Sequence, residues 1–379
     1  MYRRIALAAA MLTAAAALVV PASAGSHHIL VGIFDDAQVL GNPTRTFPLL
    51  KTLRVQIIRV SLPWGSASGV ARRRPKNPRD PADPAYNWTR YDRALLDANK
   101  QKIRVLFNIV GTPRWANGNR SVNRAPNSSK NYGYLRDFAY AAATRYSGEY
   151  KRRDRKVLPA VRYWLAWNEP NNPVFLYPQY RKVGGRWVIQ SARDYAKICS
   201  AIYSGVHGTR LTGEQVACGA TSPRGNDQPR SSRPAVDPLT FMSALRKAGL
   251  RKFDAYAHHP YYGDRRQTPT SKPEAGSVRM GNLGTLIKLL THLYGNKHLW
   301  ITEYGYQTMP PDRIFGVSWK KQARYLAQAF AIARRNPRID MMIWFLVRDE
   351  ARLSGWQSGF QTAGGRKKPS FSTFQHLPH

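Results

Sequence analysis

Past its N-terminus, the sequence lacks any run of about 20 apolar residues, the length that a membrane-spanning helix needs. It also lacks a low-complexity linker and a repeated residue motif, so nothing in it marks a boundary between domains. No Gly-rich phosphate-binding turn follows any expected strand. These absences favour one domain without a transmembrane anchor.

Acidic residues are scarce. Asp and Glu total 22 against 59 Lys and Arg, which gives a formal net charge of +37. Such an excess favours an anionic neighbour, but the basic residues are scattered and no zinc-finger, helix-turn-helix or RNA-binding motif accompanies them. We therefore expect an acidic glycan or an anionic cell wall as partner, and no nucleic acid.

Cysteine is also rare, and its two copies allow at most one disulfide. Cys199 and Cys218 can pair in an exported protein, and closing that loop would stabilise the fold by about 3 kcal/mol. The alternative is two buried thiols, one on a helix and one on a strand. The sequence leaves both open.

The N-terminus has the pattern of a secretory signal. A basic start precedes an apolar stretch at residues 5–20, and small residues at 22–24 form a cleavage site. We expect residues 1–24 to be the signal peptide and residues 25–379 the mature domain. That domain would be extracellular, either free or associated with the cell surface, and by default a monomer.

Short apolar runs alternate with amphipathic helical stretches along the rest of the chain. The expected strands are residues 29–34, 55–60, 103–110, 163–167, 216–220, 253–257, 298–302 and 341–347. Strands of this length separated by single helices indicate right-handed βαβ units and a parallel sheet. Eight such units close a barrel, so the predicted fold is a single-domain α/β protein, a (β/α)8 (TIM) barrel.

Two of the expected strands, the fourth and the seventh, end in a glutamate. Residues 163–167 run into Asn168, Glu169 and Pro170, and Pro170 ends the strand because it has no N–H to donate. The seventh strand runs into Glu303. Strand ends four and seven face each other across the barrel mouth, so the two glutamates can flank one bond. In a close carboxylate pair one pKa rises, which supplies the acid and the nucleophile or base that glycosidic hydrolysis needs.

Five further residues at strand ends or in the eighth strand are candidate substrate-binding residues. Arg59 and Tyr261 are expected to hold the second glutamate by charge and by a hydrogen bond. Asn168 can bind a sugar hydroxyl, and His259 can orient Tyr261 or the sugar. Trp344 offers a flat face for a pyranose ring. Each has a structural alternative, such as core packing for Trp344. Four loop aromatics are further candidates for the floors of sugar subsites: Trp115, Tyr177, Tyr180 and Trp187.

With these motifs, residues 29–374 resemble the retaining glycoside hydrolases of clan A. WNEPN matches the acid/base motif of the clan and ITEYG its nucleophile motif, while FNIVGTPRWANG and YNWTRYDRALLDA are most similar to family 39 and related bacterial exopolysaccharide hydrolases. The resemblance implies that Glu303 attacks the anomeric carbon while Glu169 protonates the leaving oxygen and later activates water, with no metal or cofactor. Asn108 departs from the pattern, because some clan members have His there. The β-sandwich that many family 39 enzymes carry is not expected.

A reading from another class is a catalytically idle barrel that binds a glycan or an anionic cell wall through its basic surface. The presence of both glutamates favours the enzyme, a secreted hydrolase of β-linked poly- or oligosaccharide. Transglycosylation passes through the same covalent intermediate and stays an alternative outcome.

Overall fold

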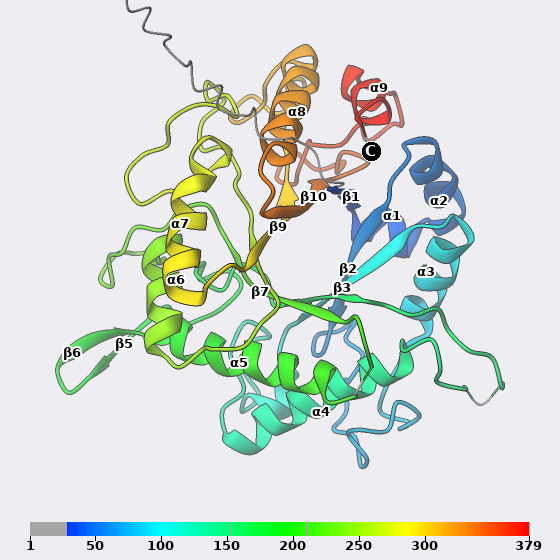
Figure 1. Cartoon of the computed structure of the whole chain (residues 1–379), viewed down its shortest axis with the longest axis vertical. Coiled ribbons are helices and arrows are strands. Elements are labelled where there is room, and N and C mark those ends of the chain that lie inside the picture. The colour runs from blue at the N-terminus through cyan, green and yellow to red at the C-terminus, as the bar shows by residue number, and fades with distance from the viewer. Residues whose placement is uncertain (1–28, 153, 210, 379) are drawn as a thin grey trace, which may run out of the picture.

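The computed structural model describes residues 29–152, 154–209 and 211–378, and the expected signal peptide lies outside them. Eight parallel strands close into a barrel in the order β1-β10-β9-β8-β7-β4-β3-β2 (Figure 1). They are Leu30–Phe34 (β1), Ile57–Pro63 (β2), Arg104–Val110 (β3), Tyr163–Ala166 (β4), Gln215–Thr221 (β7), Ala255–His258 (β8), His298–Tyr304 (β9) and Ile339–Phe345 (β10). The predicted (β/α)8 barrel is confirmed.

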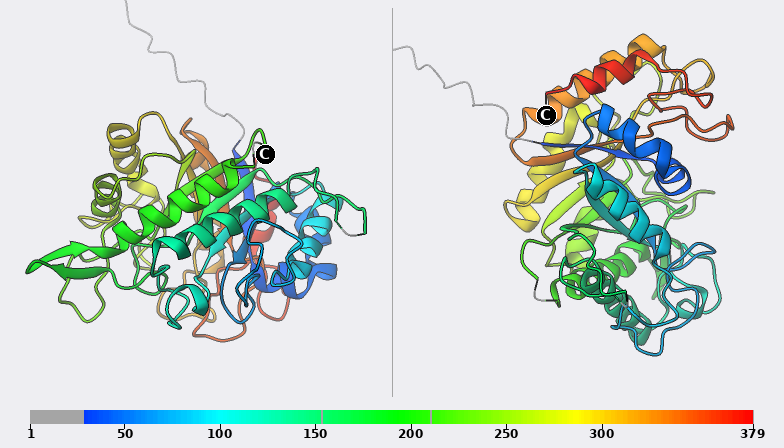
Figure 2. Two further views of the ribbon diagram at one scale, coloured as in Figure 1. Left: turned by 90° about the horizontal axis from the view of Figure 1, so that it is seen from below. Right: turned by 90° about the vertical axis from the view of Figure 1, so that its right-hand side faces the viewer.

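Helices form an outer ring around these strands (Figures 1 and 2). They are Asp36–Gly41 (α1), Pro43–Thr52 (α2), Thr89–Lys100 (α3), Ser129–Arg145 (α4), Gln190–His207 (α5), Pro238–Lys247 (α6), Leu283–Tyr294 (α7), Trp319–Arg334 (α8) and Pro369–Gln375 (α9), with 3-10 turns at Arg114–Ala116 and Met280–Asn282. The long helices α4 and α5 lie side by side. They approach closely at Gly205, where a Cβ would lie 2.2 Å from the backbone oxygen of Arg136.

Successive side chains of each strand alternate between the barrel interior and the layer under the helices. On β2, Ile57 packs in the interior, so Arg59, two residues later, also points inward. On β10, Met341 and Ile343 belong to the interior cluster, whereas Trp344 packs in the outer layer. The pleat therefore decides which residues of a strand end can reach the barrel mouth.

The long loop expected after β4 contains a hairpin that the sequence analysis did not identify. Tyr180–Val183 (β5) and Arg186–Ile189 (β6) pair antiparallel around Gly184 and Gly185, which both have positive φ, and the hairpin projects from the barrel (Figure 2). Paired glycines of this kind match the twist of a two-residue hairpin turn. Its Trp187 is 40% exposed.

Cys199 on α5 and Cys218 on β7 are joined in a disulfide, with their Cα atoms 6.0 Å apart. Both residues are fully buried. The bond ties the helix that follows the β4 loop to the next strand of the barrel. Among the described residues, no helix has the length and apolar character to cross a membrane.

The disulfide leads to a stability prediction. Unfolded, unreduced protein should contain no free thiol by a colorimetric thiol assay, and reduction should expose two. A Cys199→Ala/Cys218→Ala variant should lose about 3 kcal/mol of unfolding free energy in urea, because the loop that the bond closes regains its entropy in the unfolded chain. Two free thiols before reduction would contradict the bond.

Candidate active site

The carboxyl ends of the strands surround a cavity of about 1290 Å³. Both glutamates that the sequence singles out line it, and so do Arg59, Asn168 and Tyr261. Active sites of (β/α)8 enzymes lie at this end of the barrel, because the loops that follow the strands converge there. The cavity is therefore the candidate active site.

Glu169 follows β4 in a strained stretch of backbone. The φ angles of Trp167 and Glu169 are 67° and 37°, in the left-handed region that residues other than glycine seldom occupy. The Glu169 N–H donates to the backbone oxygen of Ala220 at 2.8 Å, and Ala220 also has a positive φ, 45°. Strain of this kind persists where the surroundings enforce it, and it gathers at functional sites.

The Glu169 carboxyl group is buried, with 8% of the residue exposed. Its Oε2 accepts a hydrogen bond from Asn172 Nδ2 at 3.0 Å, and its Oε1 lies 3.1 Å from His259 Nδ1. Burial raises the pKa of Glu169 to about 7, although the Asn172 hydrogen bond and the charge of Arg59 both act to lower it. Glu169 can thus carry a proton near neutral pH.

Glu303 lies near the end of β9, at a β-bulge. The pairing with β10 moves from Ile301–Met342 to Tyr304–Trp344, so β9 carries one extra residue between these pairs. A bulge re-aims side chains. Glu303 consequently faces the cavity although Ile301, two residues earlier, packs in the outer layer.

Donors contact both carboxylate oxygens of Glu303. Tyr261 Oη donates to Oε1 at 2.9 Å, and Arg59 Nη1 donates to Oε2 at 2.9 Å. Of the two donors, Arg59 also carries a positive charge and forms an ion pair with Glu303. The two contacts predicted for Arg59 and Tyr261 are therefore present, and they fix the orientation of Glu303.

Arg59 is a buried charge, 1% exposed, that joins several parts of the site. Besides Glu303, its Nη1 donates to the backbone oxygen of Thr302 at 3.1 Å, and its Nη2 donates to Asn168 Oδ1 at 2.6 Å. The guanidinium also stacks over the ring of Phe34, with its carbon 4.2 Å from the ring centroid. The Asn168 amide is thereby oriented at the cavity wall.

Asn108, on the neighbouring strand β3, supports the same guanidinium. In the amide orientation that satisfies both of its ends, its oxygen accepts from Arg59 Nη2 at 2.8 Å. Its nitrogen then donates to the backbone oxygens of Leu165 and Trp167, at 3.1 and 2.7 Å. Asn108 thus braces Arg59 and the end of β4.

His259 is fully buried, and its ring is held between the two halves of the site. Nε2 lies 3.3 Å from Arg59 Nη1 and 3.0 Å from Thr302 Oγ1. A guanidinium can only donate, so Nε2 accepts and the ring proton lies on Nδ1, facing Glu169. Burial lowers the pKa of His259 to about 3, so the ring is neutral. The expectation that His259 orients Tyr261 or the sugar is not met: its side chain positions Glu169.

The two glutamates lie close together. An oxygen of Glu169, an oxygen of Glu303 and a ring nitrogen of His259 all lie within 4.8 Å of one another. Three such atoms are also spaced like metal ligands. However, a cation among them would lie beside the Arg59 guanidinium, which already contacts Glu303, so the site fits a carboxylate pair better than a metal centre.

The aromatic wall of the cavity differs from the one expected. Trp344 lies in the outer layer, 1% exposed, where its Nε1 donates to the backbone oxygen of Ser358 and its ring stacks on Phe360. The prediction that Trp344 contacts a sugar is therefore wrong, because the side chain of Trp344 points into the outer layer and away from the barrel mouth. Trp356, in the loop after β10, lines the cavity instead, its ring centroid 5.1 Å from that of Tyr261.

The four loop aromatics predicted as candidate floors of sugar subsites do not line the cavity either. Trp115 packs edge-on against Trp64, Tyr180 hydrogen-bonds to Asp227, and Trp187 lies on the projecting hairpin. The aromatic residues that line it are Phe34, Phe175, Tyr261, Tyr262, Phe315, Phe345 and Trp356. Phe34 and Phe345 end strands β1 and β10, whereas the other five lie in irregular loops, where periodicity in the sequence could not identify them.

Two asparagines that directly follow the WNEP motif were missed by the sequence analysis. Asn172 donates to Glu169, and Asn171, fully buried, fastens the loop after β7. Asn171 Oδ1 accepts from the N–H of Ser222 at 2.8 Å, and its Nδ2 donates to the oxygen of Val236 at 2.9 Å. Two amides in a row at the exit of a buried strand were the available signal.

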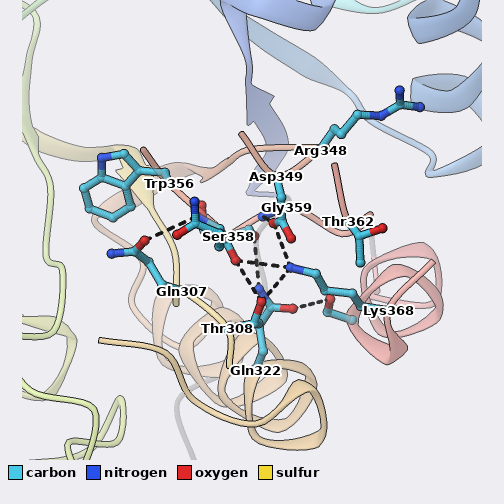
Figure 3. A network of polar contacts seen from close by, with 12 residues as sticks. Gln307, Thr308, Gln322, Arg348, Asp349, Trp356, Ser358, Gly359, Thr362 and Lys368 are labelled. Carbon is cyan, nitrogen blue, oxygen red and sulfur yellow. Dashed lines mark hydrogen bonds and ion pairs between the residues drawn. The ribbon is translucent and has the colours of Figure 1, made fainter. Parts of the chain in front are cut away.

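A buried ion pair supports the wall on the side of β10. Lys368 Nζ donates to Asp349 Oδ1 at 2.7 Å, to Thr308 Oγ1 at 2.8 Å and to the backbone oxygen of Gln357 at 3.1 Å (Figure 3). The side chains of Lys368 and Asp349 are 0% and 2% exposed. The pair fastens the segment before α9 to the cavity loop that carries Asp349 and Trp356.

The fold is similar to those of several solved glycoside hydrolases. A family 39 glycoside hydrolase from Bacteroides cellulosilyticus has a TM-score of 0.61 and 18% identity, over 91% of this chain and 62% of its own. A fungal β-1,4-galactanase has 0.59 and 14%, over 92% and 99%. The family 1 β-glucosidase from Thermotoga maritima has 0.57 and 10%, over 92% and 96%.

At these identities the likeness shows a shared barrel fold. The chain spans less than two thirds of the family 39 enzyme, at 62% of its length, and nearly all of the other two. No protein-family model and no curated protein sequence matches the chain. The fold that the resemblance to clan A implied is nonetheless the one observed.

The Lys368–Asp349 pair leads to a second stability prediction. Lys368→Met should lower the unfolding free energy by about 3–5 kcal/mol, because it leaves the Asp349 carboxylate buried without its counter-charge. Lys320→Met, an exposed lysine on α8, is the matched control and should change it by less than about 0.5 kcal/mol. Equal urea midpoints and slopes for the two variants would show that the pair is not a structural anchor.

Proposed function

We propose that this protein is a retaining glycoside hydrolase that cleaves β-glycosidic bonds of a poly- or oligosaccharide by double displacement. The observation that carries the proposal is the carboxylate pair at the barrel mouth. Glu169 has a pKa raised to about 7, while Glu303 accepts from Arg59 and Tyr261 through both oxygens. One group is suited to donate a proton and the other to attack carbon.

The first displacement forms a covalent intermediate. Glu303 attacks the anomeric carbon, and the bond from that carbon to the leaving oxygen breaks while Glu169 gives the oxygen its proton. The donors from His259 and Asn172 leave Glu169 in a fixed position, and its burial keeps the acid form populated near neutral pH. Asn168, oriented by Arg59, is placed to bind a sugar hydroxyl.

The second displacement returns the enzyme to its starting state. Glu169, now a carboxylate, takes a proton from a water molecule, whose oxygen attacks the anomeric carbon and releases Glu303. A sugar hydroxyl in place of water would give transglycosylation. Two displacements on one carbon restore its configuration, so the product is expected to be the β-anomer.

The spacing of the pair supports retention over inversion. Inverting enzymes hold a water between carboxyl groups about 6.5–9.5 Å apart, whereas retaining pairs lie about 5–5.5 Å apart. Here an oxygen of Glu169 and one of Glu303 are within 4.8 Å. That gap leaves room for the anomeric carbon but little for an intervening water.

We also propose that the protein is exported and acts on a carbohydrate outside the cytoplasm, as a monomer. Two observations support export: the signal-like pattern of residues 1–24 and the Cys199–Cys218 bond, since disulfides persist mainly in oxidising compartments. The net charge of +37 supports an acidic glycan or an anionic wall as its surroundings.

The roles of the two glutamates can be separated by mutation. Glu303→Gln should lower kcat on aryl β-glycosides and polysaccharides by roughly 1,000-fold or more, because no covalent intermediate forms. Glu169→Ala should keep part of its activity on substrates with good leaving groups, and added azide should yield a β-glycosyl azide. Product configuration by NMR gives the stereochemistry.

Glu149→Gln, an exposed glutamate outside the cavity, is the matched control and should keep wild-type rates. Equal release of reducing ends by the wild type and Glu303→Gln would contradict the hydrolase. Glycan binding without hydrolysis by the wild type would instead favour an idle, carbohydrate-binding barrel.

The raised pKa of Glu169 predicts the alkaline limb of the pH profile. As a general acid Glu169 must be protonated, so kcat/KM should be highest below its pKa of about 7 and fall about tenfold per pH unit above it. The limb should disappear in Glu169→Ala assayed with a good leaving group. His259, whose pKa is about 3, should not contribute near neutrality. A limb that persists in Glu169→Ala would assign the acid to another group.

A further inference from the structure

The loop after β7, residues 222–236, contains three arginines, of which Arg230 does not line the cavity. Arg224 and Arg233 are exposed, and both line the cavity. Within the part of the chain that the structure describes, neither guanidinium forms a hydrogen bond or an ion pair with a side chain or the backbone. The two charges are therefore open to a ligand in the cavity.

This loop is braced by its own hydrogen bonds rather than loosely held. Asn226 Oδ1 accepts from the N–H groups of Gln228 and Ala235, both at 3.1 Å, and its Nδ2 donates to the backbone oxygen of Arg233 at 3.2 Å. The Gly225 N–H donates to the carboxylate of Asp237 at 2.8 Å. The backbone on either side of each arginine is thus fixed before a ligand arrives, which lowers the entropy cost of binding.

The loop is also fastened to the proton donor. Asn171 binds both of its ends, at Ser222 and Val236, and the Glu169 N–H donates to Ala220 just before it. In the barrel β7 is the neighbour of β4, which precedes Glu169, whereas β9 with Glu303 lies on the other side of β8. If Glu169 protonates the leaving oxygen, as proposed above, the leaving-group sugar is expected on the side of this loop.

The acidic groups of the outer cavity wall have hydrogen-bond partners of their own: Asp36 accepts from the N–H of Ser61, and Glu350 accepts from the N–H of Trp356. Asp35 accepts hydrogen bonds from the N–H groups of Gln38, Val347 and Arg348, and Asp349 is paired with the buried Lys368. The third arginine of the outer wall, Arg348, lies after β10 and already donates to Gln361 at 3.3 Å. The free positive charge is concentrated on the Glu169 side.

We propose that Arg224 and Arg233 bind an anionic group, a carboxylate or a sulfate, on the sugar of the leaving-group side. This rests on the hydrolase function proposed above. Guanidinium groups favour such oxyanions, with which they form charge-assisted hydrogen bonds. Cleavage then occurs directly before an acidic residue of the glycan, so each new non-reducing end carries the anionic group.

The test compares one glycan with and without its charge. The substrates are a β-linked polysaccharide that contains uronic acids and the same polymer after chemical reduction of its carboxyl groups, which leaves its linkages unchanged. A sulfated β-glycan and its desulfated form make a second pair, which distinguishes carboxylate from sulfate. The readout is the ratio of kcat/KM on the charged polymer to that on its neutral form.

We expect the wild type to favour a charged polymer by about tenfold or more. Arg224→Gln and Arg233→Gln should each lower the ratio by about threefold, and the double variant by about tenfold. Salt should weaken the preference of the wild type more than that of the double variant. Arg45→Gln, which removes an exposed arginine of α2 outside the cavity, should keep the wild-type ratio.

Product analysis by mass spectrometry should locate the acidic residue at the new non-reducing end. A wild-type ratio near one, an unchanged ratio in the double variant, or a loss in Arg348→Gln alone would overturn the proposal. Absence of hydrolysis on every substrate would instead contradict the hydrolase. In that case, calorimetric binding of charged and neutral oligosaccharides to wild type and double variant decides the arginine site independently, and equal affinities would overturn it.

Discussion

The buried guanidinium of Arg59 is the interaction on which the site depends. A charge that is 1% exposed is tolerated only when paired and hydrogen-bonded. Arg59 therefore needs Glu303 as its counter-ion, and it draws Asn168 and His259 into the same cluster. His259 contacts Arg59 through Nε2 and Glu169 through Nδ1, and so links the position of Glu169 to that of Arg59. The two carboxylates thus receive different environments from one network: Glu303 is ion-paired, while Glu169 contacts only neutral donors. The proposed roles of nucleophile and acid require such a difference.

The pleat and its irregularities decide which side chains enter the cavity. Arg59 and Asn108 point inward by simple alternation from Ile57 and Leu106. Glu303 reaches the mouth only because β9 carries an extra residue, and Glu169 only because the backbone takes a left-handed turn after Ala166. Regular strands build the barrel, and local departures from regularity build the site.

The same distinction explains what could be predicted from the sequence. Strand order and the barrel follow from the alternation of apolar runs and helices, and the pairing of Glu169 with Glu303 follows from two similar strand endings. The prediction for Trp344 is wrong because a run of large apolar residues does not show which side chains face the barrel interior. Trp356 and Asn171, whose side chain binds both ends of the loop at residues 222–236, lie in irregular loops that show no hydrophobic periodicity. Whether Cys199 meets Cys218 depended on a Cα separation that only packing between α5 and β7 determines.

Asn171 limits which changes the loop at residues 222–236 can tolerate. One amide holds both ends of the loop at residues 222–236 and lies two positions from Glu169. The loop therefore has defined boundaries. The residues between Ser222 and Val236 can change in length and charge while these two residues still bind Asn171. Exchange of the segment between these two residues would change the cavity wall without displacing Glu169, whereas a graft that moved either residue would disturb both the wall and Glu169.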